Sequence, residues 1–317
     1  MTKPFDALAL GSIYLDIHYG EFPFDPEIGI RSETETVGNE VQLRVGGSAA
    51  NFAQVGSGLG LKTALVAKIG QDRVGNIVTD ILNEQNILRL IFTDPEVKTN
   101  VSSHFTNPQG DTIQTTAGTA NLALDGEDAM RVVRNYFDKI SALYIGSYFK
   151  LTMLQDKYEA IVKSAREHDV LTLLDHGMIS NVVNTGHIEQ VKSLVRNVDV
   201  YIPNEQEFLT IWNVNSIKQG FEKMLSLPKR PIIVVTRGAN GAIGLDQDGS
   251  IHDIPSFKVQ PKNAVGAGDS FNAGFLKAWQ KKFSMDEAIR YAHAVAAIRI
   301  SENTPPSKES VQALLDK

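Results

Sequence analysis

Short apolar runs alternate with amphipathic stretches along most of this chain of 317 residues. The runs typical of buried strands lie at 5–10, 63–69, 142–145 and 170–174. Apolar residues at helical spacing follow two of these runs, in 74–82 and 154–165. This alternation predicts an α/β fold with a mostly parallel sheet and helices on both of its faces. Ligands in that architecture bind beyond the C-terminal ends of the strands.

Two segments break the alternation and show the period of two that half-buried antiparallel strands have. One is 41–45, and the other is 101–113 with a turn at 107–111. We expect these segments to build a small β-sheet lid from insertions at about 15–45 and 97–118. An edge extension without function would have the same pattern. Because no linker or repeat divides the chain, 1–317 is expected to form a single domain.

Composition excludes several classes of function. The chain has 31 basic and 37 acidic side chains and a net charge of −6, without a Lys/Arg run, so nucleic acid is not an expected partner. It has no cysteine, which rules out disulfides, thiolate nucleophiles and Cys-ligated zinc and makes the cytoplasm the expected location. No stretch approaches the roughly 20 apolar residues of a membrane span, and no secretion signal is visible, so no membrane partner is expected.

The stretch 263–278 carries the strongest chemical signal. Gly266, Ala267 and Gly268 would open a helix, where backbone N–H groups can converge on an anion and the helix N-terminus adds about half a positive charge. Asp269, in the first turn, would be placed to take a proton from a hydroxyl group. A glycine-rich helix start with an Asp cap is the simpler interpretation of these residues taken alone.

Two clusters have a structural interpretation beside a functional one. Segment 45–53 runs into a helix of small residues, so its paired glycines would permit close ligand approach, with Asn51 one turn into the helix. Tight helix packing explains that pattern equally well. Asn204 and Glu207 are three residues apart and could face a hydrated Mg²⁺ ion, but a capping box has the same spacing.

Common nucleotide-binding motifs are absent. The dinucleotide fingerprint fails because Phe271 stands where its third glycine belongs, and 56–63 lacks the Gly-Lys-Ser/Thr of a Walker A loop. If ATP binds, another loop must therefore hold its phosphates. Segment 234–242 is an apolar strand followed by a glycine turn, for which a hairpin is a sufficient explanation.

These clusters in this order, together with 11–16 and 68–75, resemble the ribokinase family, also called the pfkB-type carbohydrate kinases. The resemblance covers essentially the whole chain. It implies a ribokinase-like three-layer α/β/α core, a β-sheet lid, and transfer of the ATP γ-phosphate to a hydroxymethyl group. Phosphoryl transfer needs alignment and charge stabilisation, which a base, an anion hole and a metal supply, so ATP and Mg²⁺ are the implied cofactors.

The resemblance also implies roles for individual residues. Asp269 matches the family's catalytic base, and Gly266, Ala267 and Gly268 match its anion hole. The residues that match the grip on substrate are Asp16, Gly46, Gly47 and Asn51. Asn204 and Glu207 match the motif that organises Mg²⁺ through water. The residues implied in nucleotide binding are Asn204, Thr236, Gly238, Gly241, Gly268 and His293, although ordinary helix packing explains His293 equally well.

The chain departs from the family pattern at three places. Asn263-Ala264 stands where Asp-Thr is common, and 302–304 replaces a usual Gly-Ala. Because those positions help to form a monovalent-cation site in relatives, such a site is doubtful here and activity should depend only weakly on potassium. Segment 175–179 also lacks the Arg of an Asp-x-Asn-x-Arg motif, which counts against phosphosugars and sugar acids as substrates.

The expected function is therefore that of an ATP-dependent kinase of a neutral sugar. A nucleoside kinase of the same family is the alternative, and a non-catalytic binding protein on a kinase fold is more remote. Phosphoryl transfer here requires no histidine, so surface positions or pocket lining are expected for His18, His104, His176 and His293. An exposed lid sheet has edges that invite pairing, so a homodimer through the lid is a further expectation.

Overall fold

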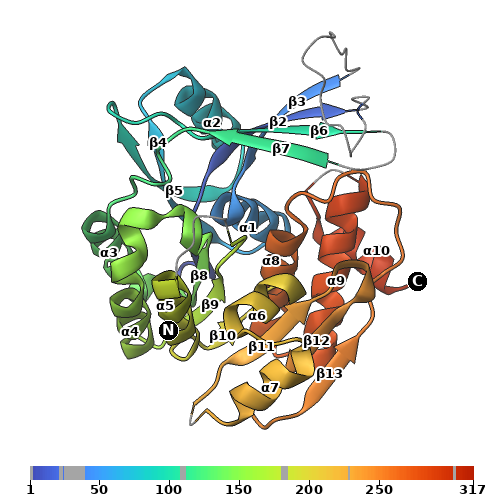
Figure 1. The fold of residues 1–317 in the computed structure, drawn as a ribbon. Helices are drawn as coiled ribbons and strands as arrows, with labels where there is room; N and C mark the ends of the chain where they lie inside the picture. The colour runs from blue at the N-terminus through green and yellow to red at the C-terminus, as the bar shows by residue number, and fades with distance from the viewer. Residues whose placement is uncertain are drawn as a thin grey trace.

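The computed structural model describes residues 3–20, 24, 40–107, 112–179, 185–227, 229–302 and 305–317. Within these ranges, nine strands form the larger of two sheets, in the order β13-β12-β11-β10-β9-β8-β1-β4-β5 (Figure 1). The strands are β1 Ala7–Leu10, β4 Thr63–Gly70, β5 Ile87–Asp94, β8 Ala142–Gly146, β9 Leu171–Asp175, β10 Val200–Tyr201, β11 Ile232–Thr236, β12 Ala242–Leu245 and β13 Ile251–Ile254. All neighbours from β5 to β11 pair in parallel, and β12 and β13 add antiparallel pairings. The expected mostly parallel α/β sheet is confirmed.

Helices cover both faces of this sheet. The helices on one face are α1 Ser48–Gly58, α2 Arg73–Asn83, α8 Ala267–Gln280, α9 Met285–Glu302 and α10 Lys308–Leu315. Those on the other face are α3 Gly126–Arg134, α4 Tyr158–Glu167, α5 Thr185–Val195, α6 Glu205–Trp212 and α7 Ile217–Leu225. Each face has its own apolar core, and a strand buried on both sides contributes alternate residues to each. The three-layer architecture is therefore as expected.

The predicted helices form with one difference. Helix α2 buries Val78 and Leu82 as the spacing of its apolar residues indicates. The predicted helix over 154–165 begins later, because Thr152–Lys157 forms a 3₁₀ helix and α4 starts only at Tyr158. Apolar residues three and four apart suit both kinds of helix, so the spacing alone could not separate them.

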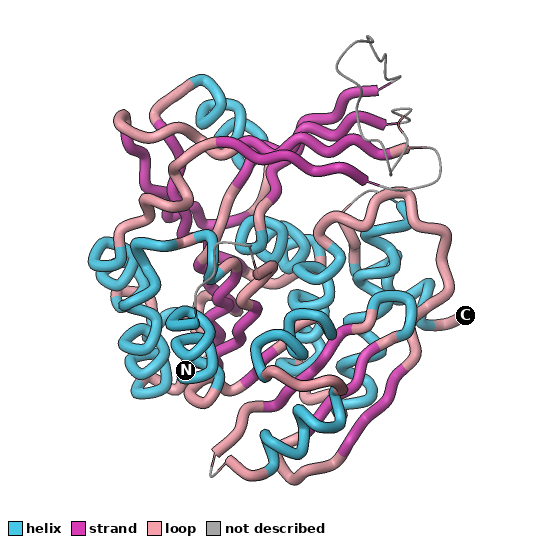
Figure 2. The backbone as a smooth tube through the Cα atoms, viewed as in Figure 1, coloured by secondary structure: helices cyan, strands magenta, loops and turns pink. Residues whose placement is uncertain are grey.

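A second sheet of four strands stands apart from the first, as the tube in Figure 2 shows, in the order β3-β2-β6-β7. Its strands are β2 Tyr14–Gly20, β3 Glu40–Gly46, β6 Val101–Thr106 and β7 Thr112–Ala117. Strands β2–β3 and β6–β7 pair antiparallel as expected, but β2 and β6 pair in parallel. Between β2 and β6 the chain passes through β3, α1, β4, α2 and β5, a long crossover of the kind that parallel neighbours require.

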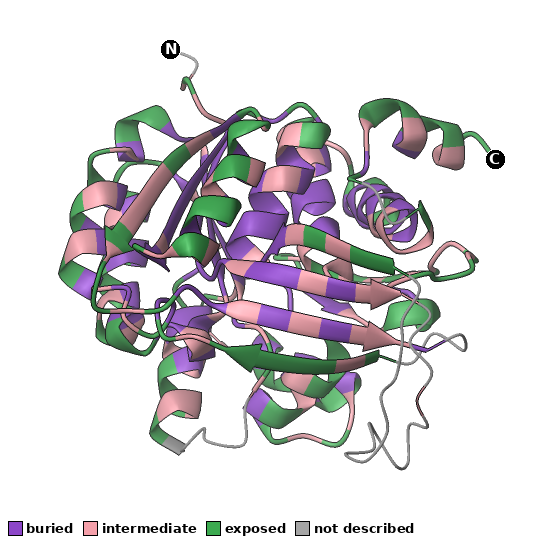
Figure 3. Cartoon of the chain, turned by 90° about the horizontal axis from the view of Figure 1, so that it is seen from above, coloured by how far each residue is buried: buried purple, intermediate pink, exposed green. Residues whose placement is uncertain are grey.

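Two of the three apolar residues of β3 that alternate along the strand are exposed, and only Val45 is buried. Val41 and Leu43 are 59% and 48% exposed, while the alternate residues Gln42 and Arg44 are only partly exposed. Within the second sheet, the view from above shows buried residues concentrated in its two central strands, β2 and β6 (Figure 3).

Parts of both predicted lid insertions lie outside the described residues: most of the insertion at 15–45, and 108–111 of the insertion at 97–118. No helix of the described chain is long and apolar enough to cross a membrane.

Candidate active site

Two cavities meet at the N-terminus of α8. One, of about 480 Å³, lies between the second sheet, α1 and the ends of β8 and β9, and Val265, Gly266 and Asp269 line it. The other, of about 340 Å³, lies between the loop after β11 and helices α8 and α9, and Ala264, Ala267 and Gly268 line it. The segment 264–269 thus forms a wall of both cavities. We call them the polar cavity and the α8–α9 cavity.

The turn that starts α8 has the conformation an anion site requires. Gly266 is the N-cap in the left-handed region, at φ 79°, and a side chain there would lie 3.2 Å from Nδ2 of Asn51. A side chain on Gly268 would meet nothing within 4 Å, so this glycine faces open space. The first N–H groups of a helix have no intrahelical partner and point beyond its end.

Asp269 lies in the first turn of α8 and accepts two hydrogen bonds. Nδ2 of Asn51 donates to one carboxylate oxygen at 2.8 Å, and the hydroxyl of Tyr144 donates to the other at 3.4 Å. Burial and the negative charge of Asp175 raise the pKa of Asp269 to about 7, although Asn51, Arg299 and Tyr144 act in the opposite direction. A carboxylate with this pKa is an effective proton acceptor near neutral pH.

Two more carboxylates lie within electrostatic reach of Asp269. Asp175, at the end of β9, accepts a hydrogen bond of 2.7 Å from Nδ2 of Asn272, yet burial raises its pKa. Burial raises the pKa of Glu207 too, and the charges of Asp175 and Asp269 add to the effect. Because the three carboxylates repel one another, a divalent cation among them would relieve the repulsion, and carboxylate oxygens are ligands that Mg²⁺ prefers.

Asn204 and Glu207 form a capping box at the start of α6. The Asn204 side chain accepts from the N–H of Glu207, and the Glu207 carboxylate accepts from the N–H of Asn204, both at 2.9 Å. The structural interpretation of this pair is confirmed. The capping box also fixes the orientation of the Glu207 carboxylate. It is compatible with a role of Glu207 at Mg²⁺, which stays a prediction.

Asp16 projects from β2 into the polar cavity and is 5% exposed. Gly47 lines the same cavity, but Gly46 is not among the described residues that line it. A Cβ atom on Gly46 would stand 1.8 Å from a carboxylate oxygen of Asp16. Gly46 therefore makes room for the Asp16 side chain, which is a different task from the direct substrate contact that the sequence predicted.

The α8–α9 cavity collects most of the predicted nucleotide-binding residues. Thr236, Gly238 and His293 line it together with the start of α8. Gly241 does not, because it turns the chain into β12 at φ 86°, where a side chain would meet the carbonyl of Ile254. Nε2 of His293 is buried without a hydrogen-bond partner among the described residues.

The four candidate histidines are buried, so the alternative of surface positions is wrong for all of them. His104 and His176 line the polar cavity, and His293 lines the α8–α9 cavity. His176 has a structural role, since its Nδ1 bonds the carbonyl of Gly177 at 2.7 Å and its Nε2 bonds the hydroxyl of Tyr201 at 2.9 Å. Burial lowers the pKa of His176 to about 4, which keeps it neutral.

Sequence reasoning missed several residues at this site. Asp175 ends a strand of the large sheet, and the rule that ligands gather at strand ends would have identified it. Tyr144 lies inside an apolar run and has no local signal. Arg299 lies in the last turn of α9, 30 positions after Asp269 in the numbering, and only the packing of α9 brings its charge to Asp269.

Comparison with known proteins decides the family. The model of the pfkB family of carbohydrate kinases matches residues 18–308. The chain belongs to this family. The match also confirms the enzyme class expected from the sequence, a phosphotransferase that acts on an alcohol group of a carbohydrate.

Relatives of this pfkB kinase include 5-dehydro-2-deoxygluconokinase 1 of Bacillus cereus (strain ZK / E33L), which is 25% identical, with 99% of this chain and 96% of the relative covered. The ribokinase of Arabidopsis thaliana, solved with ribose and ATP, superposes with a TM-score of 0.78 at 20% identity and full coverage of both chains. A protein of E. coli described as a ribokinase II, solved with ATP and Mg²⁺, gives 0.81 at 17% identity over 98% of this chain and 99% of its own. These superpositions confirm the ribokinase-like fold.

Proposed function

We propose that this pfkB kinase transfers the γ-phosphate of ATP to a hydroxymethyl group of a sugar. The polar cavity would hold the sugar and the α8–α9 cavity the nucleotide, so the transferred group would pass along the segment 264–269. One observation carries this proposal: the first turn of α8 lies between the two cavities, with Asp269 lining one of them and Ala267 and Gly268 lining the other.

In this mechanism Asp269 accepts the proton of the attacking hydroxyl, while Asn51 and Tyr144 hold its carboxylate in place. The N–H groups at 266–268 stabilise the negative charge that develops on the phosphoryl oxygens. Asp16 accepts hydrogen bonds from other hydroxyls and fixes the orientation of the sugar. Glu207, with Asp175 and Asn204 near it, would hold Mg²⁺, which neutralises phosphate charge when bound.

A sugar acid is the second candidate substrate. Its support is Lys150, the one lysine or arginine among the described residues lining the polar cavity, and the name of the Bacillus relatives, which act on a dehydrodeoxygluconate. A carboxylate would bind an ammonium group at that place. A neutral sugar, the expectation from the sequence, would not need this residue.

The test is a coupled assay of ADP release with ribose, fructose, 5-dehydro-2-deoxygluconate and adenosine, each with Mg²⁺ and ATP. We expect turnover with a sugar or sugar acid and none with adenosine. Lys150→Met should raise KM about tenfold or more for an acidic substrate, since a charged hydrogen bond contributes about 1.5–3 kcal/mol, and leave KM for a neutral sugar nearly unchanged. Binding without ADP release for every compound would contradict the proposal.

A further inference from the structure

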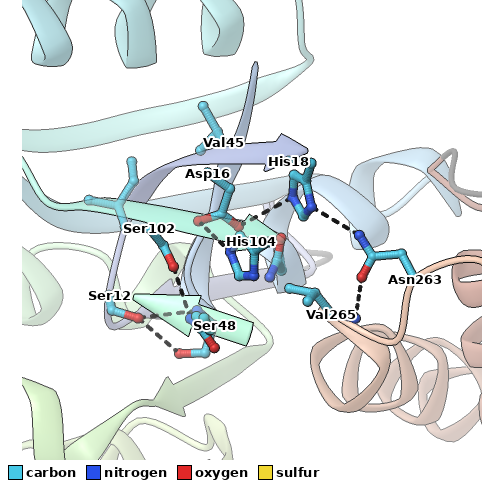
Figure 4. A network of polar contacts seen from close by, with 12 residues as sticks. Ser12, Asp16, His18, Val45, Ser48, Ser102, His104, Asn263 and Val265 are labelled. Carbon is cyan, nitrogen blue, oxygen red and sulfur yellow. Dashed lines mark hydrogen bonds and ion pairs between the residues drawn. The ribbon is translucent and has the colours of Figure 1, made fainter. Parts of the chain in front are cut away.

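A chain of hydrogen bonds joins the second sheet to the loop that precedes the anion-binding turn (Figure 4). The N–H of Val265 donates to Oδ1 of Asn263 at 2.9 Å. Nδ2 of the same Asn263 bonds Nδ1 of His18, on β2, also at 2.9 Å. The Asn263–His18 contact joins residues 245 positions apart. It connects β2, which also carries Asp16, to the segment that leads into the turn at 266–268.

The donors and acceptors along this chain of hydrogen bonds are fixed. Because the Asn263 carbonyl oxygen accepts the N–H of Val265, its amide nitrogen is the atom that faces His18, and an amide nitrogen only donates. Nδ1 of His18 must therefore accept and carries no proton. A neutral imidazole then has its proton on Nε2, the atom that lies 4.0 Å from a carboxylate oxygen of Asp16.

The charges around His18 agree with a neutral ring. It faces Asp16 on its own strand and stacks on His104 of β6, with ring centroids 4.5 Å apart. Arg44 of β3 and Arg299 of α9 add positive charge nearby. Burial first, and then the charges of His104, Arg44 and Arg299, lower the pKa of His18 to about 3.

A metal ion is the obvious alternative occupant, since ligand atoms of Asp16, His18 and His104 lie within 4.8 Å of one another. The two imidazole planes differ by only 10° and are stacked. An ion at about 2.1 Å from both nitrogens would have to lie near both ring planes, and stacked rings do not allow this. The proton on Nε2 of His18 excludes that nitrogen as a ligand as well. The stacked arrangement of His18 and His104 therefore does not fit a metal ion held by both rings.

We propose that His18 is a positioning residue for phosphoryl transfer, which acts through Asn263 on the segment leading into the turn at 266–268. The inference rests on the proposed function. The backbone N–H groups of Lys262 and Asn263 bond the carbonyl of Ile300 at 2.8 and 3.2 Å, so α9 anchors one side of this segment and His18 the other. Substrate contact at Asp16 and the order of the anion hole are thereby connected.

Asn263→Asp tests this arrangement. The new carboxylate still accepts the N–H of Val265, but it cannot donate to His18 and places a second acceptor against Nδ1. The ring must then move its proton away from Asp16 or bind a second one. We expect kcat to fall about tenfold near pH 8, as the loss of one positioning hydrogen bond would cause. The ratio of variant to wild-type kcat/KM should rise as the pH falls toward about 6, because a doubly protonated ring can donate to the new carboxylate.

Adding His18→Gln to Asn263→Asp should recover most of the lost rate, because a glutamine amide can donate to the carboxylate at any pH. The ratio of double-variant to wild-type kcat/KM should then no longer change with pH. His168→Gln is the matched control, since His168 is exposed at the end of α4 and its Nδ1 bonds the carbonyl of Ser164. A double variant no faster than Asn263→Asp, or Asn263→Asp at the wild-type rate, would overturn the inference.

A measurement without catalysis separates this inference from the proposed function. The ¹⁵N shifts of the His18 ring in the free wild-type protein should show an unprotonated Nδ1 and a protonated Nε2. A proton on Nδ1 contradicts the hydrogen-bond chain even if the protein is a kinase. If the ¹⁵N shifts are as expected but the protein phosphorylates none of the compounds, the hydrogen-bond chain is supported and the proposed function is contradicted.

Discussion

At the scale of single residues, the environment of Asp269 sets its chemistry. An exposed aspartate is ionised far below neutral pH, whereas here burial and Asp175 bring the pKa to about 7. Asn51 and Tyr144 bind the ionised form and prevent a still larger rise. The residue therefore combines a higher proton affinity with a fixed orientation, which is what a general base needs.

This environment predicts a pH dependence with a definite sign. The active form is the carboxylate, and since its pKa is raised, kcat/KM of the wild type should fall as the pH drops through about 7. Asp269→Asn should lower kcat by about 10²- to 10⁴-fold, leave the Kd of ATP nearly unchanged and abolish this limb of the profile. Asp248→Asn, in a surface turn, is the control. A near-normal kcat for Asp269→Asn would remove the residue from the role of base.

The residues found from sequence are those whose signal is local. Gly266, Gly268 and Asp269 are adjacent in the chain, so their spacing alone predicts a helix start with an acid in its first turn. Asp175 and His18 gain their roles from contacts with residues about 100 and 245 positions away. No local pattern encodes such pairs, because only the packing of the elements brings them together.

At the scale of elements, α8 has two glycines with opposite tasks. Gly268 faces open space at the N-terminus, while a side chain on Gly274 would lie 2.9 Å from Val295 and 3.0 Å from Ala292 of α9. One end of the helix is thus free to meet a ligand, and its middle is packed closely against its neighbour.

Valine at each position should separate these tasks. Gly274→Val should destabilise the protein by about 1–3 kcal/mol through overpacking and lower Tm, with kcat/KM nearly unchanged in the folded fraction. Gly268→Val should change Tm little but lower kcat/KM about 100-fold or more, because the side chain would block the N–H groups that, in the proposed mechanism, face the phosphoryl oxygens. Calorimetry and steady-state kinetics measure both. Full activity in Gly268→Val would refute the anion hole.

The elements themselves were predictable where the sequence has a clear helical period, as in α2, or a continuous apolar run, as in β1, β4, β8 and β9 of the large sheet. The strands of the second sheet were predicted, but the sequence did not say which of their two sides is buried. The alternation in 41–45 shows two faces and not which one meets the protein. In the structure the polar residues Gln42 and Arg44 lie on the less exposed side of β3, in the same sheet as Asp16.

At the scale of the whole molecule, the exposed side of the edge strand β3 is the surface that we expect a second copy of the protein to cover. Strand β3 ends the order of the second sheet in the described chain, and Val41 and Leu43 are exposed on it. We expect the protein to sediment as a dimer at micromolar concentration and Val41→Lys/Leu43→Lys to sediment as a monomer, since charge at an edge opposes pairing. Ile251→Lys, at the edge of the large sheet, should stay dimeric. A monomeric wild type contradicts this prediction.

The strand order of the large sheet has a consequence for synthesis. Strand β1 lies inside the sheet, β4 and β5 join on one side of it, and β8 to β13 follow in sequence on the other. As the chain leaves the ribosome, each new strand can therefore pair with an exposed edge, and none has to be inserted between two strands already paired. Helix α8 follows the last of the described strands, so every described strand of the large sheet has been synthesised before Asp269.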